Sequence, residues 1–158
     1  MDLLLALVLT STTFAAGTTV PKSMVAIPCD GENHSPALQW KGEPSGTRSF
    51  ALILHDPDAP HAGGFYHWVL YNLPRDTHGI VRDAQLAANQ TGRNDSSTTL
   101  GYFGPCPPPG KLHHYVLTLY ALDIDNLNAA QPLSAGDLLD RMHGHILAIA
   151  TVTATLER

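Results

Sequence analysis

The stretch "HHYVLTLYALD", His113 to Asp123, is the part of the sequence that best predicts the fold. It is rich in β-branched, aromatic and leucine residues, which are common in strands. In a strand, Tyr115 and Leu117 would lie on one face, and Val116 and Tyr120 on the other. Because both faces are largely apolar, we expect this strand to be covered on both sides, inside a sandwich or beneath helices.

Three further segments have strand character and are bounded by glycine or proline. They are "SFALILHD" (Ser49 to Asp56), "YHWVLYNL" (Tyr66 to Leu73) and "HILAIATVTATLE" (His145 to Glu157). The segment Leu7 to Phe14 reads equally well as a first strand or as the apolar part of an export signal. The sequence therefore predicts a mostly β fold.

One helix has clear start and stop signals. Ser134 is the expected N-cap, Asp137 is its capping-box partner and Gly144 is the stop. Between residues 80 and 99 we expect a long surface connection with one short helical turn over Asp83 to Ala88. With 158 residues, the chain is long enough for one domain, which we place over residues 1–158 with one or two short helices.

Composition and charge exclude some classes of function. The chain has a net charge of -5 and only 15% charged residues, so it offers no basic surface for nucleic acid. The apolar run in "MDLLLALVLTSTTFAAG" is shorter than the roughly 20 residues that a membrane span needs. Asp2 stands where an export signal has basic residues, so we favour a cytoplasmic protein and keep a periplasmic or secreted one as the alternative.

The two cysteines give little support to zinc or redox chemistry. Cys29 and Cys106 do not belong to a C-x-x-C pair, and two cysteines are too few for a disulfide framework. A single bridge between them stays open if the protein is exported.

The stretch "HDPDAPHAGGFYHW", His55 to Trp68, combines carboxylates with histidines. Asp56 and Asp58 end one predicted strand, and the prolines between and after them stiffen the loop, so that it loses little entropy on binding. His67 begins the next strand, and sequential strands are often neighbours. We therefore expect His67 to lie beside the aspartate loop.

A second stiff loop, "GYFGPCPPPGKLHH", covers Gly101 to His114 and has four prolines in five residues. It also leads into a strand that begins with histidines. Cys106 near His113 is the only candidate nucleophile, and we interpret it as structural or bridged, so we expect no enzyme activity. Two aspartates and two histidines form a credible metal-ligand set, but no H-E-x-x-H motif is present and we expect neither a metal nor a cofactor.

The motifs "DPDAP", "HWVLYNLP", "NHSPALQW" (Asn33 to Trp40) and "GPCPPPGKLHHYVLTLYALD" resemble the phosphatidylethanolamine-binding protein family, also called Raf kinase inhibitor-like proteins. The resemblance covers nearly the whole chain. The compact length and the "CDGEN" motif are similar to the bacterial and archaeal branch. The resemblance implies a β-sandwich with a small anion pocket at one end.

By this resemblance, the pocket residues and the pocket wall fall on particular positions of the chain. They are Asp56, Asp58, His67, His113 and Tyr115 for the pocket, and Cys106, Pro107 and Pro108 for the wall. Cys106 departs from the Gly-Pro-Pro sequence of many members, and its thiol could narrow the mouth or be bridged to Cys29. The C-terminal helix that closes the pocket in animal members has no counterpart here, which puts phospholipid affinity in doubt.

The resemblance and the residues together predict a non-enzymatic binding protein for a phosphate-bearing headgroup or another small anion. Neutral His67 and His113 would each donate one hydrogen bond, and a bound dianion would favour their protonated forms, so affinity should rise as the pH falls. The alternative is a protein-interaction regulator, similar to a kinase or protease inhibitor, that presents the loops Asp56 to Gly64 and Gly104 to Gly110. We therefore expect a phosphorylated ligand or a signalling-protein partner, and we also consider a homodimer.

Overall fold

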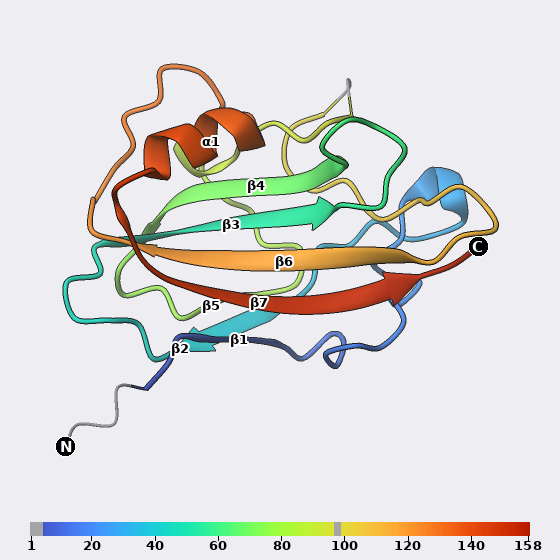
Figure 1. Cartoon of the computed structure of the whole chain (residues 1–158), viewed down its shortest axis with the longest axis horizontal. Helices are drawn as coiled ribbons and strands as arrows, with labels where there is room; N and C mark the ends of the chain where they lie inside the picture. Colours follow the sequence, from blue (N-terminus) through green and yellow to red (C-terminus); the bar gives the residue numbers. More distant parts are fainter. Residues whose placement is uncertain (1–4, 97–98) are drawn as a thin grey trace.

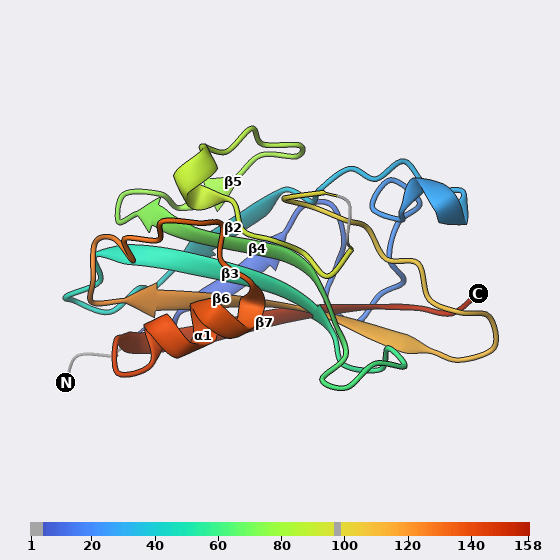
Figure 2. The same cartoon turned by 90° about the horizontal axis from the view of Figure 1, so that it is seen from above.

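The chain folds into two antiparallel sheets that face each other, as the computed structural model shows for residues 5–96 and 99–158 (Figures 1 and 2). The larger sheet has the strand order β4-β3-β6-β7, and the smaller one has the order β1-β2-β5. The strands are β1 (Val8–Ser11), β2 (Leu38–Lys41), β3 (Ser49–Asp56), β4 (Phe65–Pro74), β5 (Gly79–Ile80), β6 (His113–Leu122) and β7 (Ile146–Leu156). The predicted mostly β sandwich is confirmed.

One α-helix and two short 3-10 turns complete the described structure. They are α1 (Ala135–Met142), η1 (Ile27–Cys29) and η2 (Ala88–Gln90). The predicted cap of α1 is present, because the Ser134 hydroxyl accepts a hydrogen bond from the Asp137 backbone N–H at 3.1 Å. Gly144 follows the helix at a φ of 83°, a left-handed conformation that glycine adopts without strain. None of the helices in the described part of the chain has the length and apolar character that a membrane crossing requires.

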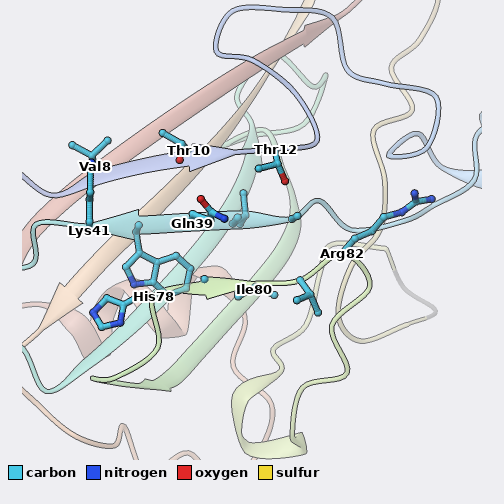
Figure 3. A pocket seen from close by; sticks show the side chains of 13 residues that line it. Val8, Thr10, Thr12, Gln39, Lys41, His78, Ile80 and Arg82 are labelled. Carbon is cyan, nitrogen blue, oxygen red and sulfur yellow. The ribbon is translucent and has the colours of Figure 1, made fainter.

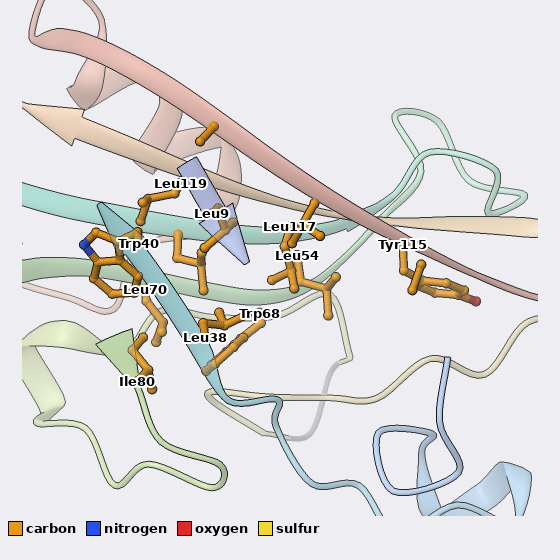
Figure 4. Close-up of a cluster of buried hydrophobic side chains, with 14 of the residues drawn as sticks. Leu9, Leu38, Trp40, Leu54, Trp68, Leu70, Ile80, Tyr115, Leu117 and Leu119 are labelled. Atoms are coloured by element: carbon orange, nitrogen blue, oxygen red, sulfur yellow. The ribbon is translucent and has the colours of Figure 1, made fainter. Parts of the chain in front are cut away.

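Both faces of the large sheet are buried along strand β3. Between the sheets, Leu9 and Trp40 of the small sheet pack with Leu70 and Leu119 of the large one (Figure 4). On the opposite face, a second cluster lies under α1, which contributes Leu138. The expectation that the His113–Asp123 strand is covered on both sides is only partly correct. In β6 (His113–Leu122) the face that meets the small sheet is buried, whereas the opposite face is exposed at His114 and half-buried from Val116 to Tyr120.

Two local predictions were wrong in their extent or position. The first strand is only Val8–Ser11, not Leu7 to Phe14, and residues 1–4 of the apolar run, including Asp2, lie outside the described residues. The expected short helical turn of the 80–99 connection does form, but further along the chain, as η2 from Ala88 to Gln90, and the residues from Asp83 to Ala87 are not helical. Asp83 has a left-handed φ of 55° and its carboxylate accepts the Ser35 N–H at 3.1 Å, which is incompatible with starting a helix there. Residues 97–98 of the predicted connection also lie outside the described part.

The strand register brings four chain segments to one end of the large sheet. Asp56, the last residue of β3, pairs with Phe65, the first of β4. At the same end, His113 at the start of β6 pairs with Leu156 at the end of β7. The two proline-containing loops of the sequence therefore meet at this end of the sandwich.

Candidate functional site

A cavity of about 170 Å³ opens where the two loops meet. The residues that line it are Asp56, Ala59, Pro60, His61, Phe65, His67, Phe103, Cys106, Pro107, Pro108, His113 and Tyr115. Seven of the eight residues expected from the sequence are among them, and Asp58 is not. The predicted site residues are thus brought together from β3, β4, β6 and the loop that precedes β6.

A buried hydrogen-bonded pair, Asp56 and His113, forms the floor of the site. The Asp56 carboxylate accepts a hydrogen bond from Nδ1 of His113 at 2.7 Å, and both side chains are only 3% exposed. The other Asp56 oxygen accepts the Asp58 backbone N–H at 2.9 Å. Both carboxylate oxygens are therefore occupied, and Asp56 serves to orient His113, leaving Nε2 as the ring nitrogen that is free for a ligand.

His67 is held in a similar way by the backbone of the second loop. Its Nδ1 donates to the Phe103 carbonyl at 2.8 Å, and the Phe103 N–H donates to the His67 carbonyl at 2.9 Å. Burial lowers the pKa of His67 to about 4, because the low-dielectric surroundings disfavour the charged ring. His67 is therefore neutral at pH 7 in the empty protein.

These hydrogen bonds change the expected chemistry of the two histidines. A neutral imidazole has one N–H, and in His67 and His113 that N–H is already given to Phe103 and Asp56. The expectation that the neutral rings donate to an anion is therefore corrected. In a neutral ring whose Nδ1 carries the proton, Nε2 is an acceptor, and it becomes a donor only when the ring takes up a second proton.

Tyr115 adds a buried hydroxyl at the edge of the core. The side chain is 1% exposed, lies at one end of the row of core residues and points its oxygen away from them (Figure 4). Among the described residues, this hydroxyl makes no hydrogen bond of normal distance and angle, although the Asp56 carboxylate lies close enough to act on it as an acceptor. Burial and then the nearby Asp56 charge raise the Tyr115 pKa, so the hydroxyl stays protonated and can donate.

Asp58 lies outside the cavity, in contrast to the sequence prediction. Its carboxylate accepts hydrogen bonds from the backbone N–H of His114 at 2.8 Å and from Nδ1 of His114 at 2.7 Å. These hydrogen bonds lower its pKa. Because the loop turns between the two aspartates, Asp56 points inward while Asp58 ties the loop to the exposed face of β6.

The wall of the cavity is anchored by a disulfide bond. Cys106 is bonded to Cys29, with a Cα to Cα distance of 5.6 Å and a sequence separation of 77. Of the alternatives left open by the sequence, the bridge is therefore the one observed. Pro107 and Pro108 follow directly and line the cavity.

Sequence reasoning missed the apolar part of the site. Phe65 lines the cavity from the start of β4 and Phe103 from the loop before β6, and the ring centroid of Phe65 lies 4.6 Å from that of His67. Ala59, Pro60 and His61 form the rim. Phe65 could have been found from its place two residues before His67 on the same strand face, whereas Phe103 lies in an irregular segment that gives no such signal.

A larger hollow of about 640 Å³ lies on the outer face of the small sheet (Figure 3). Its polar side chains, such as Gln39 and Lys41, are exposed, and His78 is paired with Glu43 at 2.8 Å. Exposed groups are already well hydrated, so they gain little from an anion. The smaller cavity, with its buried histidines, is therefore the candidate site.

The described residues contain no group of three or more His, Cys, Asp or Glu side chains placed to hold a metal ion.

The family model described as phosphatidylethanolamine-binding protein matches residues 10–157. The chain belongs to the phosphatidylethanolamine-binding protein family. A member from the archaeon Methanothermobacter thermautotrophicus, a UPF0098 protein, is 44% identical over 135 residues, which cover 82% of this chain and 87% of that protein. The UPF0098 protein YbhB of Escherichia coli is 40% identical over 131 residues, covering 79% and 82% of the two chains.

The fold agrees with a crystal structure from the same family. Escherichia coli YbcL, described as a member of the mammalian PEBP family, superposes with a TM-score of 0.89 at 33% identity and covers 96% of this chain and 98% of its own. The bacterial and archaeal relatives confirm the branch of the phosphatidylethanolamine-binding protein family that the sequence predicted.

Proposed function

We propose that this protein is a non-enzymatic binding protein whose cavity takes up a small anion, in particular the phosphate-bearing part of a zwitterionic headgroup. The observation that carries the proposal is the Tyr115 hydroxyl, a buried donor that makes no well-formed hydrogen bond among the described residues, beside a cavity that His67 and His113 also line. Unpaired buried donors are costly and are rare without a ligand or water to satisfy them.

The size and the walls of the cavity support a headgroup rather than a whole lipid. About 170 Å³ is smaller than the cavities of roughly 300 Å³ or more that hold drug-sized ligands. Phe65 and Phe103 give it apolar walls, on which a cationic group can rest. Cys106 is in a disulfide and offers no thiolate nucleophile, which supports a binding role over catalysis.

Anion affinity is expected to increase as the pH falls. Binding must add a proton to a ring such as His67, whose pKa is about 4 in the empty protein. Uptake of one proton strengthens binding about tenfold per pH unit, hence up to about 100-fold from pH 8 to pH 6. NMR titration of the histidine side chains with sulfate, a dianion that does not itself titrate in this range, measures the effect directly.

The same titration includes phosphoethanolamine and, as a control without an anion, ethanolamine. Saturable shifts of His67 and His113 with sulfate and phosphoethanolamine, absent in His67→Ala, support the proposal. Calorimetry in buffers of different ionisation enthalpy should count close to one proton taken up per anion bound. No saturable response to either anion at millimolar concentration would remove the anion-binding function.

The two aspartates are expected to differ in their effect on this binding. Asp56→Asn keeps the shape of the side chain but replaces the charged acceptor that orients the His113 ring, so affinity for sulfate at pH 6 should fall about tenfold or more. Asp58→Asn is the matched control, because Asp58 bonds to His114 outside the cavity and should alter affinity less than about twofold. Equal losses in both variants would contradict the assigned geometry.

In the alternative function, a protein-interaction regulator, the contact surface would be formed by the loops at the same end of the molecule as the cavity. The loops that flank the cavity have exposed residues, including Pro57, Pro108 and Pro109, and proline keeps them stiff. If the cavity fails to bind either anion, these loops are the surface to test for a protein partner.

The disulfide also bears on the compartment. Disulfides persist in oxidising compartments and are rare in the cytosol. The Cys29–Cys106 bond therefore supports the periplasmic or secreted alternative over the cytoplasmic one that the N-terminal sequence favoured.

A further inference from the structure

The end of strand β7 lies beside the loop that forms the cavity wall (Figure 1). The register pairs Leu156 of β7 with His113 of β6, where the proline-rich loop enters the sheet. Arg158, two residues further on, reaches this loop.

Arg158 contacts the loop through both its side chain and its main chain. Its Nη1 donates to the Pro107 carbonyl at 3.0 Å, and the Gly110 N–H donates to the Arg158 carbonyl at 2.8 Å. One residue thus holds both ends of the segment 107–110.

The composition of this segment explains why it needs an outside partner. Pro107, Pro108 and Pro109 have no backbone N–H, so the segment cannot form a hydrogen-bonded turn or strand of its own with these residues as donors. Its carbonyls must be satisfied by donors from elsewhere. For Pro107, that donor is the guanidinium of Arg158.

We propose that Arg158 is a positioning residue for ligand binding, which acts by fixing Pro107 and Pro108 against the cavity. This inference rests on the proposed anion-binding function. The wall lies between two anchors, the Cys29–Cys106 bond before Pro107 and the Arg158 contacts around residues 107–110. Because the wall is already held in place before binding, no conformational entropy is lost in ordering it when the ligand enters, and the bound ligand is released more slowly.

The test compares Arg158→Ala with a matched arginine elsewhere. Arg141 on α1 also donates from Nη1 to a loop carbonyl, that of Leu127, at 2.9 Å, but that loop does not line the cavity. We expect Arg158→Ala to weaken sulfate binding at pH 6 about five- to tenfold, mainly through faster dissociation. Arg141→Ala should lower the melting temperature about as much as Arg158→Ala does, but it should leave sulfate binding unchanged.

A third variant separates position from charge. Arg158→Lys keeps the charge but not the fork of donors, so it should recover only part of the affinity. Complete recovery in Arg158→Lys, together with a strong dependence on salt, would mean that Arg158 acts by long-range charge and would overturn the proposal. Unchanged affinity in Arg158→Ala would overturn it as well.

Failure of the proposed function can be told apart from failure of this inference. If wild-type protein binds neither sulfate nor phosphoethanolamine, the anion-binding function is wrong. The position of the wall is then read from the backbone amide resonances of Cys106 and Gly110 in the free protein. These resonances should shift in Arg158→Ala and not in Arg141→Ala, and if they stay in place, Arg158 does not position the wall.

Discussion

At pH 4 the free energy of unfolding is expected to be about 3 kcal/mol lower than at pH 7 through His67 alone. The folded protein holds this ring neutral, because burial lowers its pKa from 6.5 to about 4. In the unfolded chain the ring is hydrated and takes up its proton near pH 6.5. Between these two values the unfolded state binds more protons than the folded state, so stability falls as the pH falls. Most of the loss should occur between pH 6.5 and pH 4.

Urea unfolding at a series of pH values and constant ionic strength measures this effect. In His67→Asn, the amide can still donate to the Phe103 carbonyl near the position of Nδ1, but the side chain no longer titrates. The variant should lose the His67 part of the pH dependence even if its stability at pH 7 is lower. His61→Asn, at the exposed rim of the same cavity, is the control and should keep the wild-type dependence. Identical pH profiles for wild type and His67→Asn would show that His67 is not held neutral by burial.

The same linkage connects stability to function. The negative charge of a bound anion stabilises the positive charge of a protonated ring, which burial otherwise disfavours. Sulfate should therefore stabilise the protein more at pH 5 than at pH 7. Acid thus destabilises the unliganded protein because His67 is buried. Acid favours the anion-bound protein because Nδ1 of His67 is already bonded to Phe103, so that only a second proton makes Nε2 a donor.

The sequence predicted the long elements well because their signals are local. The range of β3 was predicted to the residue, and α1 was recognised from the cap at Ser134 and the glycine at position 144. The short strands β2 and β5 were missed. Their formation depends on pairing over long distances in sequence, such as Leu9 with Trp40, and four residues or fewer give too little periodicity to detect.

The site was predictable in its members but not in its hydrogen bonds. The motifs located Asp56, His67, His113 and Tyr115, which the fold brings into one cavity. Nothing in the spacing of Asp56 and Asp58 indicates that one carboxylate points inward and the other bonds to His114. Likewise, the partner of His67 is the backbone carbonyl of Phe103, 36 residues away. Every residue has a backbone carbonyl, so the sequence does not show which one His67 contacts.

Removal of the disulfide is expected to have the largest effect on stability. The Cys29–Cys106 bond closes a loop with a sequence separation of 77 residues. Restricting the unfolded chain over a loop of this length contributes about 4 kcal/mol. For a chain of this size, such a loss lowers the melting temperature by roughly 8–16 °C. Calorimetry of the Cys29→Ala/Cys106→Ala double variant, and of wild type with and without a dithiol reductant, measures the change.

Sulfate binding by the reduced protein shows whether the disulfide shapes the cavity or only stabilises the fold. Several hydrogen bonds join the same two segments without the bridge, including Ala26 N–H to the Pro105 carbonyl at 2.9 Å and the Tyr102 hydroxyl to the Met24 carbonyl at 2.7 Å. The fold should therefore survive reduction at 20 °C, while Pro107 and Pro108 lose their covalent anchor and sulfate binding weakens. The double variant must not respond to the reductant. If thiol titration of the unreduced wild-type protein in denaturant finds two free thiols, the bond does not form and this expectation is wrong. A reduced protein with a lower melting temperature but unaltered affinity would mean that the disulfide stabilises the fold without shaping the cavity.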